Sequence, residues 1–120
     1  MIITYEFSRD EVNLCALSVK KFFKNTTTLV RRRIPVGNGY ILSIATGNMP
    51  EIGCEIVAFK SEAGPTSEDY DRMIRIHNIE MCDTLLKNMI SDFPRKDGEV
   101  EEWRDDWQAE IYRLSRYYTA

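Results

Sequence analysis

Hydrophobic and polar residues alternate at the start of the chain and then change to a helical period. The alternation in IITYEF, residues 2–7, predicts a short strand. Ser8 and Glu11 have the spacing of a capping box, and apolar residues then recur every three or four positions to about Lys24. We therefore expect a strand followed by an amphipathic helix over residues 8–24. The apolar face of this helix comprises Val12, Cys15, Ala16, Val19, Phe22 and Phe23.

Residues 26–60 have the pattern of three strands joined by turns. Residues 26–34 are rich in β-branched side chains, and the Gly37-Asn38-Gly39 sequence supplies the positive φ angles that a hairpin needs. Residues 40–47 and 54–60 predict two further strands. Together with the N-terminal strand, these segments indicate a four-stranded, mostly antiparallel sheet.

The second half of the chain has a helical period. Thr66 or Ser67 can cap a helix whose apolar positions continue to about Phe93, and PRKDG at residues 94–98 interrupts it. A last helix is expected over residues 99–117. The predicted fold is one α+β domain over residues 1–120, in the order β-α-β-β-β-α-α, with helices packed on the sheet. The apolar stripe of the last helix is Val100, Trp103, Trp107, Ile111, Leu114 and Tyr118.

The composition is that of a soluble globular protein, with 43% hydrophobic and 29% charged residues. No apolar run approaches the roughly 20 residues needed to cross a bilayer, and the N-terminus has no basic start followed by an apolar segment. The three cysteines, Cys15, Cys54 and Cys82, are widely spaced and odd in number, which favours a reducing compartment and buried thiols over a disulfide framework. We expect a cytoplasmic protein that does not insert into membranes.

No catalytic motif is present in the sequence. His77 is the single histidine, and its apolar helical surroundings predict a partly buried side chain rather than a base. Its spacing of five from Cys82 does not place both side chains on one helix face, as a zinc site would favour. We therefore expect no catalytic residues, metal or cofactor. A small enzyme or enzyme subunit remains an alternative, which would need a deep pocket gathering His77 or several carboxylates.

The net charge of −3 is unevenly distributed along the chain. Residues 1–60 carry a net charge of +3, and residues 61–120 carry −6. We interpret the arginines in the basic segment as solvated residues of an edge strand, whose consecutive side chains point to opposite faces and cannot form one clamp. A partner's acidic surface and nucleic acid are the alternatives, although the pI near 5.2 argues against nucleic acid. The basic segment comprises Lys20, Lys21, Lys24, Arg31, Arg32 and Arg33.

The last helix combines acidic and aromatic side chains. One interpretation is that Trp103 and Trp107 fix the helix on the domain while the acids are merely solvated. The other is that exposed aromatics within an acidic field bind a basic surface on a partner. Tyr112 and Tyr117 lie off the apolar stripe, and we expect both to be exposed. The acids of this predicted surface are Glu101, Glu102, Asp105, Asp106 and Glu110.

The leading hypothesis is a small non-catalytic binding protein that inhibits or adapts a host macromolecular complex. Small, motif-free accessory proteins of phages and mobile elements, including anti-defence proteins, have this general character, although no specific residues identify a family. The acidic, aromatic helix would block a basic site sterically. An immunity protein against a toxin nuclease would use the same chemistry, and nucleic-acid binding through the basic segment is a further alternative. A homodimer is compatible with each hypothesis. The proposed mechanism requires acids that are not already paired with the chain's own arginines.

Overall fold

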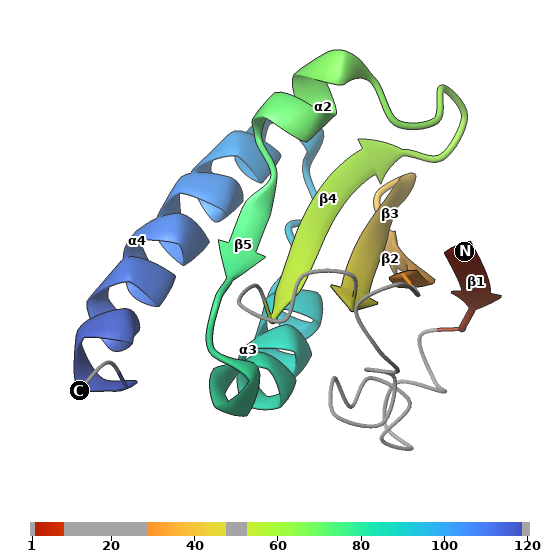
Figure 1. Cartoon of the computed structure of the whole chain (residues 1–120). Helices are drawn as coiled ribbons and strands as arrows, with labels where there is room; N and C mark the ends of the chain where they lie inside the picture. Colours follow the sequence, from red (N-terminus) through yellow and green to blue (C-terminus); the bar gives the residue numbers. More distant parts are fainter. Residues whose placement is uncertain (1, 9–28, 48–52, 119–120) are drawn as a thin grey trace.

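A five-stranded sheet with its strands in sequential order forms the centre of the computed structural model, which describes residues 2–8, 29–47 and 53–118 (Figure 1). The first two strands are parallel and the other neighbours are antiparallel. The predicted α+β class and the mostly antiparallel sheet are confirmed. The strands are β1 (Ile2–Glu6), β2 (Leu29–Gly37), β3 (Tyr40–Gly47), β4 (Cys54–Lys60) and β5 (Ile74–Ile76).

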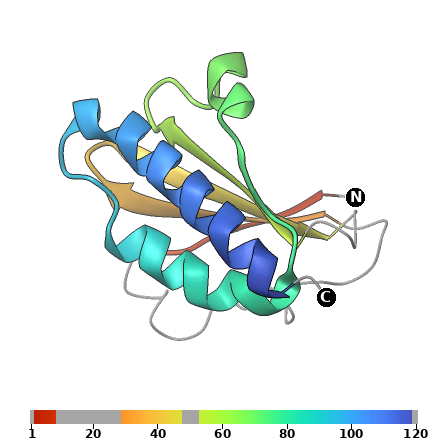
Figure 2. The same cartoon turned by 90° about the vertical axis from the view of Figure 1, so that its left-hand side faces the viewer.

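Two helices, α3 (Ile79–Ser91) and α4 (Val100–Tyr118), lie against one face of the sheet (Figure 2). A short helix, α2 (Ser67–Asp71), follows β4, and a single 3-10 turn, η2 (Asp97–Glu99), precedes α4. The hydrophobic core fills the space between this sheet face and the two long helices. Its most buried members include Ile34, Leu42, Ile44, Ile56, Ile76, Leu86 and Met89.

The alternation predicted for β2 is present in the structure. Val30, Arg32 and Ile34 are fully buried on the helix-covered face, while Arg31 and Arg33 between them are only half-buried. Because successive strand residues point to alternate faces, Arg31 and Arg33 lie on the face of the sheet that α3 and α4 do not cover. However, β2 pairs with β1 on one side and β3 on the other. The prediction that these arginines protect an edge strand is wrong, since β1 and β5 form the edges of the sheet.

The helix predicted to run from Thr66 to Phe93 is interrupted by a strand. Ile74 and Ile76 are 2% and 0% exposed, and Arg75 between them is exposed. This short stretch therefore alternates like a strand, although the residues around it have a helical hydrophobic period. Pairing with β4 completes a fifth strand where four were predicted. His77 follows β5 and is exposed, so the prediction of a partly buried helical histidine is also wrong.

The helix predicted over residues 8–24 falls almost entirely outside the described residues. Lys20, Lys21 and Lys24 also lie outside them, as does Cys15.

Candidate functional site

The apolar side of α4 packs on the core as its sequence predicts. Trp103 is 5% exposed, and its ring meets Phe93 edge-on at 4.8 Å between ring centroids. Val100 and Ile111 are also buried, and Trp107 is partly buried. The first interpretation of the tryptophans is therefore confirmed for Trp103, which fixes the helix on the domain.

The acids of α4 fall on two flanks of the helix. Successive helix residues are about 100° apart, so Glu101 and Asp105 lie on one flank while Glu102 and Asp106 lie on the other. The first pair faces Arg72, at the end of α2, and the second lines a groove beside the end of α3. The two flanks have different chemistry.

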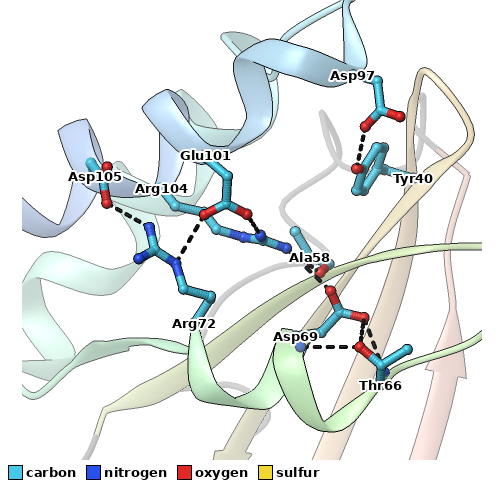
Figure 3. Close-up of polar contacts among 9 residues, drawn as sticks. All are labelled: Tyr40, Ala58, Thr66, Asp69, Arg72, Asp97, Glu101, Arg104 and Asp105. Atoms are coloured by element: carbon cyan, nitrogen blue, oxygen red, sulfur yellow. Dashed lines mark hydrogen bonds and ion pairs between the residues drawn. The ribbon is translucent and has the colours of Figure 1, made fainter.

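The flank that faces α2 is already neutralised by the chain itself (Figure 3). Arg72 lies between Glu101 and Asp105, with its Nε 3.0 Å from a Glu101 oxygen and its Nη2 2.5 Å from Asp105 Oδ1. The hydrogen bond to Asp105 is the main cause that raises the pKa of Arg72 above its ordinary value. These two carboxylates are therefore satisfied within the fold.

A buried arginine connects α4 to the sheet below it. The Nη2 of Arg104 donates to the backbone oxygen of Ala58 at 2.8 Å and lies 3.4 Å from Asp69 Oδ1, while its Nη1 donates to Glu101 (Figure 3). Asp69 is held in place by a capping box with Thr66, which confirms Thr66 as the helix cap. Sequence reasoning missed Arg104, and its position next to the apolar stripe of α4 is the signal that could have indicated burial.

Tyr40, Asp97 and Lys60 form a second polar cluster, beside a groove on the side of α4 that faces α2. The Tyr40 hydroxyl donates to Asp97 Oδ1 at 2.5 Å, and Lys60 lies 2.8 Å from the other oxygen of that carboxylate. Burial, followed by the hydrogen bond to Asp97, raises the pKa of Tyr40 to about 12. The groove encloses about 280 Å³ and also contains Arg104. Lys60 and Arg104 already contact carboxylates of the chain itself. These contacts connect β3 and β4 with η2 and α4.

The flank that faces α3 is different because no cation in the described part of the chain neutralises its acids. A groove of about 200 Å³ lies between the end of α3 and the first half of α4. Within the described residues, Glu102 and Asp106 have no ion pair or hydrogen-bond partner, and they are four residues apart on one helix face, where like charges repel. We call this surface the acidic tryptophan groove. It is lined by Asp92, Pro94, Glu99, Glu102, Trp103, Asp106 and Trp107.

Asp92 joins the two tryptophans that line the acidic tryptophan groove. Its Oδ1 accepts hydrogen bonds from the indole nitrogens of both Trp103 and Trp107, each at 3.1 Å. Trp103 is thereby fixed in the core, while the partly buried Trp107 lines the opening beside Asp106. The groove therefore presents an aromatic wall next to carboxylates that lack cationic partners in the described part of the chain.

The remaining predicted surface residues of α4 do not join this groove. Glu110 contacts Arg113 at 2.5 Å, and this hydrogen bond lowers the pKa of Glu110. Tyr112 is 66% exposed, as expected, but it lies on the same flank as Glu101 and Asp105, with the guanidinium of Arg116 5.0 Å from its ring centroid. The side chain of Tyr117 lies outside the described residues.

The predicted basic segment is not one surface. Arg32 is fully buried under the helices and donates to Thr46 Oγ1, and burial lowers the pKa of its guanidinium to about 10. Of the three arginines, Arg31 and Arg33 share the opposite face of the sheet. This arrangement corrects the interpretation of Arg32 as a solvated strand residue.

Two of the cysteines are buried, as the sequence predicts. Cys54 and Cys82 are both 0% exposed, and their sulfur atoms are 3.5 Å apart. The hydrogen bond to Cys82, followed by burial, raises the pKa of the Cys54 thiol well above its ordinary value.

Across residues 2–8, 29–47 and 53–118, no group of three or more His, Cys, Asp or Glu side chains has the geometry to hold a metal ion. In the same part of the chain, no helix combines the length and the apolar character needed to span a bilayer. Compared with protein-family models, curated proteins and solved structures, the chain has no match.

Proposed function

We propose that this protein is a non-catalytic binding protein whose acidic tryptophan groove receives cationic side chains from a basic surface on a partner. The observation that carries the proposal is the contrast between the two flanks of α4. Glu101 and Asp105 are paired with Arg72, whereas Glu102 and Asp106 have no partner within the described residues. A carboxylate pair left unneutralised beside an aromatic ring is suited to a lysine or arginine from outside.

Cation recognition at this place has two physical contributions. A guanidinium or ammonium over the ring of Trp107 gains about 0.5–1 kcal/mol at an exposed site. The carboxylates of Glu102 and Asp106 add attraction that acts over distance and accelerates encounter with a positively charged partner. The groove thus favours an arginine-rich or lysine-rich protein surface.

The proposed contact includes fewer acids than the surface expected from the sequence. Three of the five predicted acids, Glu101, Asp105 and Glu110, are engaged by the chain's own arginines. Only Glu102 and Asp106 therefore remain in the proposed contact.

The biological role that we propose is steric inhibition or adaptation of a host macromolecular complex, with α4 covering a basic site. A toxin nuclease is an alternative target of the same chemistry, since its active site must attract a phosphate backbone. The free thiols of Cys54 and Cys82 favour the reducing cytoplasm as the compartment. Nucleic-acid binding through the basic segment has less support, because Arg32 is buried.

The test is capture of partners from a lysate of the source cells by three forms of the protein. The groove variant carries Glu102→Lys and Asp106→Lys. The control variant carries Glu62→Lys and Glu68→Lys, which changes the net charge equally at two exposed acids away from the groove. We expect the wild type and the control variant to retain the same partner at physiological ionic strength and the groove variant to lose it.

Two results would contradict the proposal: recovery of no partner, or a partner that the groove variant retains. Thermal unfolding of all three forms checks that the substitutions leave the fold intact. If the captured partner is a nuclease, inhibition of its cleavage of DNA identifies the immunity-protein version.

A further inference from the structure

The face of the sheet opposite α3 and α4 carries its own charge pattern. The strand register places two rows of side chains across this face. In each row an arginine on β2 is flanked by a small residue on β3, Ala45 beside Arg31 and Ser43 beside Arg33. We call this surface the arginine face. The first row is Thr4, Arg31, Ala45 and Glu55, and the second is Glu6, Arg33, Ser43 and Val57.

The two arginines of this face are not neutralised by any carboxylate of the described residues. Within the described residues, neither Arg31 nor Arg33 forms an ion pair, and both are half-buried. The buried Nε of Arg33 has no hydrogen-bond acceptor among the described residues, and its guanidinium carbon lies 5.6 Å from the centre of the Phe59 ring. The contact with Phe59 holds the guanidinium of Arg33 in place on this face. Other arginines contact carboxylates, namely Arg72, Arg75, Arg104 and Arg113.

A groove of about 340 Å³ opens directly beside Arg33. Three of its lining residues, Phe7, Pro35 and Ile41, are apolar, and Glu6 and Ser8 complete it with Arg33. Every second residue of β2 lies on this face. Arg31 and Arg33 are followed by Pro35, which lines the apolar groove. Successive positions of this kind are about 7 Å apart in a strand.

We propose that the arginine face binds an extended acidic peptide segment of a partner protein, with two carboxylates two residues apart and an apolar side chain two residues further on. An extended peptide has the same spacing as β2, so its carboxylates meet Arg31 and Arg33 while the apolar side chain enters the groove. This surface lies on the other side of the sheet from the acidic tryptophan groove, and the inference is independent of the function proposed above.

Nucleic acid fits the arginine face less well than an acidic peptide. The ring under Arg33, Phe59, is 2% exposed and cannot stack on a base. The Glu6 carboxylate and the net charge of −3 oppose any anion, and they oppose a nucleic acid with one charge per phosphate more strongly than a peptide with two carboxylates.

The experiment measures fluorescence anisotropy of a labelled peptide, Asp-Ser-Asp-Ser-Leu capped at both ends, with the full-length protein at physiological ionic strength. The control peptide has Asn in place of both Asp residues. We expect the acidic peptide to bind roughly tenfold more tightly than the control peptide. Arg31→Gln and Arg33→Gln should each weaken its binding about fivefold.

Two further variants provide matched controls. Arg75→Gln removes a positive charge from the same face, but Arg75 is already paired with Glu55 at 2.9 Å, so binding should stay within about twofold. Glu6→Gln removes a negative charge beside Arg33 and should tighten binding. Because an unfolded protein cannot bind more tightly, this gain tests the proposal even if the arginine variants lose stability.

Several outcomes overturn the inference. The acidic peptide binding no better than the Asn peptide would remove the role of the carboxylates. Unchanged affinity in both Arg31→Gln and Arg33→Gln would move the binding elsewhere. An oligothymidylate that binds more tightly than the acidic peptide would identify nucleic acid as the ligand of this face.

Discussion

Arg32 is a charged side chain in the centre of the core, and its replacement by methionine should stabilise the protein. The side chain is 0% exposed, and burial lowers the pKa of its guanidinium from 12.5 to about 10. That lowering means that the charged form is disfavoured in the folded protein, relative to the unfolded chain, by about 3 kcal/mol. Methionine removes the charge and fills a similar space with a flexible apolar chain.

The gain from removing the charge is reduced by the contacts that Arg32 makes. One of these contacts is the hydrogen bond from its guanidinium to Thr46 Oγ1, and losing a buried hydrogen bond costs about 1–2 kcal/mol. We therefore expect Arg32→Met to raise the free energy of unfolding by about 1–2 kcal/mol, within the range found when buried charges are replaced by apolar side chains. Thr46→Val keeps the charge but removes its acceptor, and it should lower the free energy of unfolding by about 1–2 kcal/mol.

Urea denaturation at neutral pH, followed by circular dichroism, measures both effects. The two substitutions should have opposite signs, and the cost of Thr46→Val should largely disappear when Arg32 is methionine, because the donor is then absent. A loss of more than about 1 kcal/mol in Arg32→Met would refute the reasoning, since it would mean that the contacts of the guanidinium outweigh the cost of its burial.

Three further predictions concern other buried or paired groups. Gly53→Ala should lower the free energy of unfolding by about 2 kcal/mol or more in urea, because the added Cβ would lie 2.7 Å from the backbone oxygen of Ile76. The pKa of Asp97 is lowered by its lysine and tyrosine partners, so its contribution to stability is present above the ordinary pKa of 3.8 and is lost as the pH falls through the lowered value. Asp97→Asn should flatten the acid side of a stability–pH curve, and an unchanged curve would contradict this assignment. Cys54 and Cys82 should resist a thiol reagent in the native protein and react only when the protein unfolds. The absorbance of the group released from the reagent measures this reaction. Rapid reaction of either cysteine in the native protein would show that the core opens there.

Local sequence patterns predicted the strands of residues 29–60 well, because strand alternation depends on neighbouring residues. The same rule correctly separated Arg32 from Arg31 and Arg33. It failed over residues 66–93, where β5 occupies only three residues and depends on pairing with β4. Such long-range pairing leaves little trace in a short window of sequence.

The division of the acids of α4 could not have been predicted for a related reason. Glu101 and Glu102 are adjacent in the sequence and chemically identical, yet one contacts Arg72 and the other lines the acidic tryptophan groove. The difference depends on which element passes each flank of the helix. The helix predicted from Thr66 to Phe93 includes Arg72 near its start, and that prediction does not indicate that Arg72 is the partner of Glu101.

The hydrogen bonds that join both indoles to a single oxygen of Asp92 have a practical consequence. Trp103 and Trp107 are the two tryptophans of the whole chain, so its indole emission originates entirely at the junction of α3 and α4. The unlabelled protein therefore carries a built-in optical reporter. A change in emission wavelength on mixing with another molecule would register an event at this junction, while a ligand bound on the far side of the sheet would leave the spectrum unaltered.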